Sequence, residues 1–278
     1  MCNETINKKI PPRLHVLLAQ RSPQAIIIRR GPSKQVATIG WNREDDSFAV
    51  GQWFKGKIYS YRSDISPDGA YWIYFAMSDK GQTWTAVAKP PFLKALDFYP
   101  KNCAWNGGGL FASARSYWLN DGGVTKHWND RFRSGLSVLP QWRNEANRQG
   151  ECPGIYFLRL ERDGWEQQEQ VQTGKFNYVT KFCKRINDHW QLWKLFHSGL
   201  NHPAGKSPYY ESHALYNVRR GDKIEMANME WADVDKNRIV WAEEGKIMSG
   251  YVSESGLIDQ TTLFDANPLA FTELTAPY

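Results

Sequence analysis

The stretch YRSDISPDGAYWIYFAMSDKGQTWTAV, from Tyr61 to Val87, decides the fold. An Asp and a Ser-Pro-Asp-Gly turn come first, and a run of aromatic residues and a second glycine turn follow. Pro67 fixes one torsion of the first turn, and Gly69 supplies a torsion that other residues rarely adopt. Asp64 and Asp68 can accept hydrogen bonds from neighbouring backbone amides. The stretch therefore predicts strands joined by tight turns, as in one blade of a repeated β fold.

The aromatic strand after this turn has no polar face. Side chains alternate between the two sides of a strand. We expect one side to carry Tyr71, Ile73 and Phe75, and the other to carry mainly Trp72, Tyr74 and Met77. A strand of this kind is typical of a sheet that is buried on both faces, so packing between sheets explains the aromatic residues without a ligand.

Similar hairpins recur along the chain. Residues 232–254, ADVDKNRIVWAEEGKIMSGYVSE, repeat the order of Asp, turn, Trp-containing strand, turn and strand. LDFYPKNCAWNGGGLFASARSYWLND and KFCKRINDHWQLWKLFHSG match more loosely, and GIYFLRLERDGWEQQEQVQTG (residues 154–174) is also expected to form a hairpin. The second strands of these units fall near residues 26, 72, 110, 191 and 239. Most intervals are close to the roughly forty residues of a propeller blade.

We therefore expect an all-β fold that is a single β-propeller with five blades, or with six as the alternative. Residues 1–12 would form an N-terminal tail, and residues 13–278 would form the propeller domain. The wide interval between the third and fourth units contains a long insertion at about residues 120–154, with a short helix near residues 140–147.

The motif DISPDGAYWIYFA resembles the Ser-Pro-Asp-Gly repeat of the Tol-associated bacterial propeller family, closely in one blade and partly in the others. In that family the turn joins the innermost strand of a blade to the next strand, so the resemblance implies a propeller. The end of the chain, LFDANPLAFTELTAPY, echoes PPFLKALDFYP and would supply a terminal strand that completes the first blade. The order RRGPSK, GQWFKG and SPDG also resembles a wider bacterial family of uncharacterised proteins, from which no activity is carried over.

The composition is that of an ordinary globular protein with an excess of aromatic residues. Hydrophobic residues make up 41% and charged residues 23% of the chain, which excludes a disordered protein. The aromatic share of 14%, with 13 Trp, suits half-buried strands. The net charge of +6 favours an acidic protein, a nucleic acid or a phosphorylated ligand as partner. The Lys and Arg residues are spread along the chain, however, which is more typical of a solvated surface.

Targeting signals and cofactor motifs are absent from the sequence. No stretch has the composition of a signal peptide or the length of a membrane span. The four cysteines, Cys2, Cys103, Cys152 and Cys183, lie far apart, so we expect them to be reduced and mostly buried. These features favour a cytoplasmic protein with no membrane contact and no cofactor.

Two basic turns are candidate sites for phosphate or nucleic acid. The first is RRGPSK, with Arg29, Arg30, Ser33 and Lys34, and the second is VRRGDK, with Arg219 and Arg220. Cationic side chains and backbone amides around a turn can hold a phosphate. The glycine spacing and following helix of a P-loop are missing. Ordinary hairpin turns with solvated charges are the simpler alternative.

Histidines and carboxylates form two further groups. Cys183, His189, His197, His202 and His213 lack the spacing of a zinc motif, so we expect ordinary core or surface residues and no metal site. Asp64, Asp188, Glu230 and Asp233 lie near the ends of predicted inner strands. A glycosidase could place carboxylates there, at the mouth of a central channel. Blade turns use Asp for their own backbone bonds as well, and no catalytic residue is assigned.

The run VGQWFKGKIYSYR mixes aromatic side chains with Lys and Arg. Trp41, Trp53, Phe54, Tyr59 and Tyr61 lie in or near this run, and they could stack sugar rings or bases beside a charged backbone. A strand with one buried face and one wet face would produce the same alternation.

The insertion is the segment that we expect to contact a partner. It carries residue types that are enriched at interface hot spots: Trp128, Arg131, Phe132, Arg133, Trp142 and Arg143. Long loops on a rigid scaffold are commonly functional. The sequence therefore predicts a non-catalytic protein-binding or scaffolding subunit whose partner is another protein. A nucleic-acid or phosphate-ligand binding protein is the first alternative, and a glycan-directed hydrolase is the second.

Overall fold

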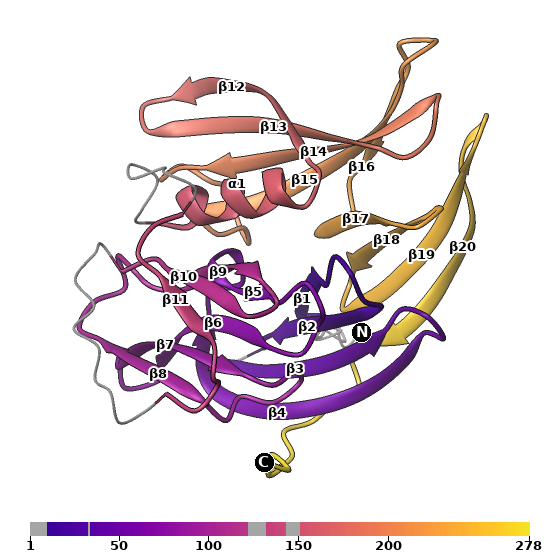
Figure 1. Ribbon diagram of the computed structural model, residues 1–278. Coiled ribbons are helices and arrows are strands. Elements are labelled where there is room, and N and C mark those ends of the chain that lie inside the picture. The colour runs from indigo at the N-terminus through magenta and orange to yellow at the C-terminus, as the bar shows by residue number, and fades with distance from the viewer. Residues whose placement is uncertain (1–9, 33, 122–131, 143–150) are drawn as a thin grey trace, which may run out of the picture.

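The computed structural model describes residues 10–32, 34–121, 132–142 and 151–278 (Figure 1). Within these ranges the chain is mostly β, with several sheets, one α-helix and one short 3-10 helix. The β-rich fold class predicted from the hairpin pattern is therefore confirmed. No helix in the described ranges is long and apolar enough to cross a membrane.

The first sheet contains eight strands and curls through the lower half of Figure 1. Its strands are β1 (Arg13–Leu18), β2 (Gln24–Arg30), β3 (Gln35–Asn42), β4 (Ser47–Ile58), β5 (Asp64–Ile65), β6 (Trp72–Ser78), β7 (Thr83–Ala88) and β8 (Asp97–Lys101). The 3-10 helix η1 (Ser60–Arg62) links β4 to β5. Only the end of β4, residues 56–58, pairs with β6, at residues 76–78. The sheet thus has two halves, β1–β4 and β5–β8, that share a short seam.

Three smaller sheets follow along the chain. The second contains β9 (Gly109–Ser113), β10 (Ser116–Leu119) and β11 (Ser137–Leu139), and β10 and β11 are parallel. The third contains β12 (Glu166–Gly174), β13 (Asn177–Arg185), β14 (Trp190–Ser198), β15 (Tyr209–Asn217) and β16 (Lys223–Met226). The fourth contains β17 (Trp231–Asp235), β18 (Arg238–Glu243), β19 (Lys246–Ser253) and β20 (Gly256–Asp265). The third and fourth sheets are antiparallel meanders, as the hairpin pattern predicted.

The helix α1 (Cys152–Arg162) corrects the hairpin expected over residues 154–174. Pro153 occupies the first turn, where its missing N–H costs nothing, and Leu and Arg residues with high helix propensity follow. The helix ends at Arg162, Gly164 follows the C-cap with a φ of 85° that suits glycine, and the strand β12 begins at Glu166. Only the second half of the predicted hairpin is therefore a strand. The short helix predicted near residues 140–147 lies mostly outside the described residues.

The predicted alternation of β6 is confirmed with one exception. Trp72 and Tyr74 pack in one core cluster, and Ile73 packs with Tyr71 in another. Met77 was expected beside Trp72, which is wrong. Because its position is odd, it lies on the Phe75 side of the strand, where the Tyr59 ring packs against the Phe75 ring and the Tyr59 hydroxyl lies near Met77 Sδ.

The Ser-Pro-Asp-Gly turn forms as its residues predict. The Gly69 N–H donates to Ser66 O at 2.8 Å, and Asp68 accepts from the Ala70 N–H. Gly69 has a φ of 74°, and a Cβ added there would lie 2.4 Å from the Gln24 side chain. The carboxylate of Asp64 does not contribute to this turn, because it faces the centre of the molecule.

The end of the chain does not supply the strand that was expected to complete the first sheet. In the described residues β20 pairs with β19, and residues 266–278 contain no strand. Arg29 on β2 holds this segment instead: its Nε donates to Ala266 O at 2.9 Å and its Nη2 to Leu269 O at 3.3 Å. Side-chain donors take the place of strand pairing here, and Pro268 has no N–H to give to a ladder.

Strands from different sheets meet at the centre of the fold. β1 lies against β5, β17 and β18, and β5 lies against β9. The helix α1 contacts η1, β9 and β12. These contacts bring residues from five distant parts of the sequence around one central cavity.

Candidate functional site: a charged central cavity

The central cavity has a volume of about 420 Å³ and lies among β1, β5, α1 and β17. Its wall carries five cationic side chains and three acidic ones: Arg43, Arg159, Arg162, Lys184, Lys194, Asp64, Asp163 and Asp233. Buried charges are costly unless they are paired or bound to a ligand. The partners of each charge therefore indicate what the cavity can hold.

Asp64 and Arg162 form a two-point ion pair across the cavity wall. Arg162 Nη1 and Nη2 lie 2.5 and 2.8 Å from the two Asp64 oxygens, and the Phe111 N–H donates to the same carboxylate at 2.7 Å. Arg162 also pairs with Asp163 at 2.9 Å. Burial alone would lower the pKa of Arg162, but the charges of these two carboxylates raise it above its usual value. The pair joins β5, β9 and the end of α1.

Lys184 and Asp233 form the second pair at this wall. Lys184 Nζ lies 2.7 Å from Asp233 Oδ1, and the side chains are 21% and 13% exposed. The Trp165 indole N–H donates to the other Asp233 oxygen at 3.3 Å. This pair links β13 to β17, and Lys184 uses only one of its three donors on it.

Lys194, also at the cavity wall, belongs to a fully buried group of polar side chains. Its Nζ lies 2.9 Å from Glu211 Oε2 and 3.2 Å from the Tyr156 hydroxyl. Burial would raise the pKa of Glu211, but Lys194 and His213 hold it well below its usual range. Burial lowers the pKa of His213, so its imidazole is neutral near pH 7.

Arg159 differs from the other cations because no described carboxylate forms an ion pair with it. Its Nη1 donates to the carbonyl oxygens of Ser60, at 3.1 Å, and Ser63. Its Nη2 lies 2.8 Å from His15 Nε2. Burial and the charge of Arg159 lower the pKa of His15 well below its usual value, so the neutral ring accepts this bond. A buried guanidinium thus faces the cavity with neutral partners only.

Among the cations of the cavity, Arg159 and Lys184 have the most hydrogen-bond donors without an acceptor in the described residues. Arg162 donates four hydrogen bonds to protein acceptors, and its Nη2 also lies 2.9 Å from Asp163 Oδ1. Within the described residues, two donors of Lys184 have no acceptor, and two donors of Arg159, on Nε and Nη2, have none either. The arrangement can therefore offer charged hydrogen bonds to an anion without breaking any existing pair.

A smaller cavity of about 30 Å³ lies behind His15 and Tyr61. Three of its buried polar atoms have no partner in the described residues: Arg30 Nε, Glu211 Oε1 and Glu230 Oε2. Its volume is close to that of one or two water molecules, which could bridge these atoms. Because His15 bonds to Arg159, the small cavity and the central cavity share one polar network.

The two predicted basic turns lie in different surroundings. Arg29 is buried and holds the C-terminal segment, Arg30 lines the small cavity, and Lys34 is exposed. Arg219 and Arg220 lie in the turn after β15, where Arg220 pairs with Asp222 and covers the Trp190 ring. Ser33 lies outside the described residues. No hydrogen bond or ion pair between described residues joins the two turns.

The predicted partner-binding insertion is described only in part. Trp128, Arg131 and Arg143 lie outside the described residues. Phe132 packs against Tyr99, and Trp142 is 2% exposed and packs against Trp118. Arg133 is exposed, and its backbone N–H donates to Asp97 Oδ1 at 2.9 Å. Binding of a partner protein through this insertion stays a prediction.

The four carboxylates considered for a hydrolase are not brought together. Asp64 and Asp233 share the central cavity, Glu230 lines the small cavity, and Asp188 is 74% exposed and paired with Arg185. The described residues also contain no group of three His, Cys, Asp or Glu side chains suited to a metal. Of the described cysteines, Cys152 and Cys183 are buried and Cys103 is exposed; all three are free.

Sequence reasoning missed the helical residues of the central cavity. Tyr156, Arg159 and Arg162 are spaced three apart, which places them on one face of a helix. That spacing is visible in the sequence, but it has meaning only if the segment is a helix, and we expected a strand. Recognising Pro153 as a helix start would have pointed to these residues.

Comparison with known proteins identifies no family for this chain. No protein-family description matches the sequence. No curated protein matches it either. Among solved structures it is similar to the uncharacterized protein lmo1340 from Listeria monocytogenes EGD-e, with 8% sequence identity and a TM-score of 0.30. The similarity covers 90% of this chain and 66% of the Listeria chain, so this chain spans just under two thirds of that length.

Proposed function

We propose that this protein is a non-catalytic binding protein that holds a small anionic ligand in the central cavity. The observation that carries the proposal is the buried Arg159 guanidinium, which faces the cavity with only carbonyl and imidazole partners. A buried cation without a counter-charge is costly, and an anion in the cavity would offset that cost. Lys184 on β13 would donate its two remaining N–H groups to the same anion.

Ion pairing of the cavity carboxylates supports binding over catalysis. A general acid or base must exchange a proton with its substrate. Asp64 accepts from both Arg162 nitrogens and from the Phe111 N–H, and Asp233 accepts from Lys184, Trp165 and its neighbouring backbone. Asp163, the third carboxylate, is paired with Arg162 at 2.9 Å. All three carboxylates therefore act as fixed supports for the cations that would meet the ligand.

We also infer a five-bladed propeller, in which the first sheet counts as two blades, β1–β4 and β5–β8. The short seam between these halves supports the division, as do the contacts of β1 with β5 and β17 and of β5 with β9. In this arrangement α1 lines the axis beside the fourth blade, and the central cavity lies at the axis, where propellers commonly bind ligands.

Calorimetric titration of the full chain tests the proposed ligand class. The probes are inorganic phosphate, pyrophosphate, adenosine monophosphate and citrate, with glucose as the uncharged comparison. At least one anion should bind with a dissociation constant in the micromolar range, and glucose should not bind. Absence of binding by all four anions at millimolar concentration would overturn the proposal.

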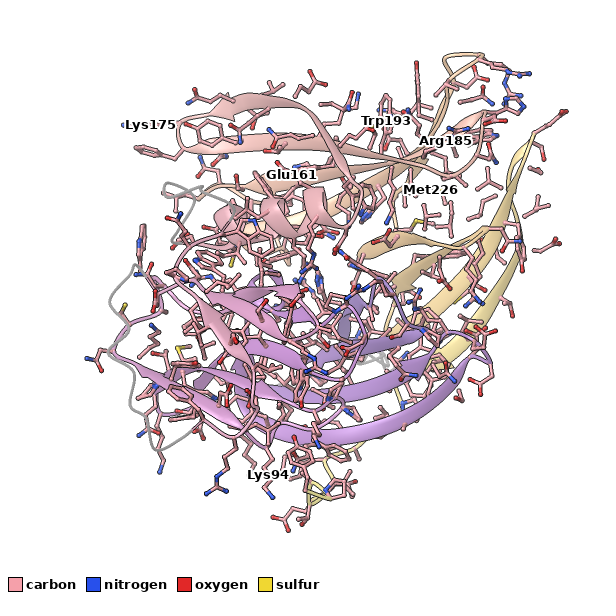
Figure 2. All side chains as sticks on the ribbon, viewed as in Figure 1. Lys94, Glu161, Lys175, Arg185, Trp193 and Met226 are labelled. Atoms are coloured by element: carbon pink, nitrogen blue, oxygen red, sulfur yellow. The ribbon has the colours of Figure 1, made fainter. Side chains whose placement is uncertain are left out.

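Three variants locate the site. Arg159→Gln and Lys184→Gln should each weaken anion binding at least tenfold, because each removes one charged hydrogen bond. Lys175→Gln, in the exposed turn between β12 and β13 (Figure 2), is the matched control and should change nothing. Lys184 is partly exposed, so its variant remains informative if Arg159→Gln fails to fold. Unchanged affinity in a folded Lys184→Gln variant would place the ligand elsewhere.

A further inference from the structure

A further cavity opens on the first sheet, and its wall is mainly aromatic, unlike the charged wall of the central cavity. It has a volume of about 250 Å³ and lies over β4, β6 and β7. Aromatic and aliphatic side chains dominate its wall: Trp53, Phe54, Tyr74, Trp84 and Leu93, with Lys94 at one side. We name it the aromatic cavity. An apolar cavity of about 150 Å³ can hold a benzene molecule, so this one has room for an aromatic side chain.

One polar group of the aromatic cavity lacks a partner. The indole nitrogen of Trp53 is buried and has no acceptor in the described residues. The Trp53 ring itself is fixed between the Arg29 guanidinium, 5.2 Å away, and the Phe271 ring, 5.7 Å away. By contrast, the Tyr74 hydroxyl donates to Leu93 O at 2.5 Å. Both polar groups are closed to solvent, so the aromatic cavity offers chiefly apolar and aromatic surface to a ligand.

Three exposed lysines lie in or next to the chain segments that form the aromatic cavity. Lys55, Lys89 and Lys94 are exposed, and none of them forms an ion pair with a described carboxylate. Their ammonium groups lie over aromatic rings instead, 5.4 Å from Phe271 for Lys55 and 5.3 and 5.4 Å from Tyr278 for Lys89 and Lys94. Charge complementarity therefore favours an acidic partner.

The protein already binds a segment of its own backbone beside this cavity. Gln52 Nε2 donates to Leu274 O at 2.8 Å, and its Oε1 accepts the Leu93 N–H at 2.7 Å. The Tyr278 hydroxyl donates to Lys94 O at 2.8 Å. Figure 2 shows Lys94 beside the end of the chain. The C-terminal segment thus lies beside the aromatic cavity through Leu274 and Tyr278, but none of its residues lines the cavity.

We propose that this surface is a docking site for an acidic peptide segment of a partner protein. The peptide places an aromatic side chain in the aromatic cavity and acidic side chains against Lys55, Lys89 and Lys94. The site is independent of the central cavity and does not depend on the anionic ligand proposed there.

Fluorescence anisotropy with labelled synthetic peptides tests this docking site on the full chain. The probe peptide is Glu-Glu-Trp-Glu-Glu, and the comparison peptides are Glu-Glu-Ala-Glu-Glu and Lys-Lys-Trp-Lys-Lys. The probe should bind at least tenfold more tightly than either comparison, and its affinity should fall as salt rises. Equal affinity for the alanine peptide would overturn the proposal, because it would show charge attraction without an anchor. Tighter binding of an oligothymidine would also overturn it, in favour of single-stranded nucleic acid.

Matched charge variants place the peptide on this surface. Lys94→Glu and Lys55→Glu should each weaken the probe peptide at least fivefold, whereas Lys175→Glu on the opposite side of the molecule should not (Figure 2). These lysines are exposed, so their replacement leaves the core intact. Trp84→Ala should abolish anchoring of the tryptophan while leaving the anion titration at the central cavity unchanged. If all three lysine variants weakened binding equally, attraction would be nonspecific and the proposal would be wrong.

Discussion

At the scale of single residues, buried charge pairs hold distant segments of this protein together. Asp64 receives bonds from α1 and β9 at once. Asp64→Asn should therefore lower the free energy of unfolding by about 3–5 kcal/mol, because it leaves Arg162 buried and under-paired. Urea unfolding monitored by Trp fluorescence measures this loss. Asp188→Asn, at a carboxylate 74% exposed, should cost less than about 0.5 kcal/mol. Equal losses in both variants would contradict the role of Asp64.

Two buried histidines make the folded state sensitive to acid. Burial lowers the pKa of His15 and of His213 below the 6.5 of an unfolded chain. Between the folded and unfolded pKa values the unfolded state binds more protons, so the free energy of unfolding falls as pH falls below about 6.5. Lowering the pH from about 7.5 to about 5.5 should cost about 1 kcal/mol for each histidine.

The His15→Gln variant tests this pH dependence. It should lose about 1 kcal/mol of the difference between the unfolding free energies at the two pH values, whereas His202→Gln, at an exposed site, should keep it. A pH dependence that is the same in both variants would show that His15 does not titrate on unfolding.

Hydrogen bonds within a short turn could be predicted from the sequence, whereas bonds between distant residues could not. The bonds of Asp68 and Gly69 were foreseen because a turn of four residues contains both donors and acceptors. Asp64 was expected to bond its own backbone, but its partner Arg162 comes 98 residues later. Nothing in a short window of sequence marks that pairing.

At the scale of elements, the described part of the insertion anchors itself to the core through Trp142. This side chain packs with Trp118 and with the buried face of α1. Trp142→Ala should lower the free energy of unfolding by about 3–5 kcal/mol, because it leaves a cavity the size of an indole. Thermal and urea unfolding would report it. Arg133→Ala, at an exposed position, should change stability by less than about 0.5 kcal/mol, and a larger effect there would argue against Trp142 as the anchor.

Strands were easier to foresee than the helix. Gly, Asp and Asn turns delimit the strands, and alternating apolar side chains identify their buried faces, so β6 and β18 were found where they lie. The segment of α1 contains aromatic and branched residues that suit strands as well. Its helical state depends on packing against η1 and β9, which the segment alone does not encode.

At the scale of the whole molecule, the C-terminal segment secures the first sheet. A chain that ends at Asn267 would lose the Leu269 acceptor of Arg29, the Leu274 acceptor of Gln52 and the Tyr278 bonds. Its melting temperature should fall by about 5 °C or more. Differential scanning fluorimetry compares it with full-length Glu273→Gln, which keeps all these contacts. An unchanged melting temperature would show that the segment does not stabilise the sheet.

The β-rich fold class followed from the repeated hairpins, but the central cavity did not. Its charges come from β1–β4, β5, α1, the third sheet and β17, and their meeting depends on how the sheets are placed around one another. The β-rich class was therefore accessible from the sequence, and two of the predicted channel carboxylates, Asp64 and Asp233, do share the cavity. The cations that surround them were not foreseen.

The hydrogen bonds from Arg29 to the C-terminal segment also have a consequence for folding during synthesis: they can form only late. Its acceptors on Ala266 and Leu269 lie 237 and 240 residues downstream, so a ribosome releases them long after β2 has emerged. Until then Arg29 cannot donate to Ala266 and Leu269, and the nascent first sheet lacks these two stabilising hydrogen bonds. A product of interrupted translation would lack these bonds, so its first sheet would unfold more readily. Proteases would therefore cleave it faster than a chain that contains Ala266 and Leu269.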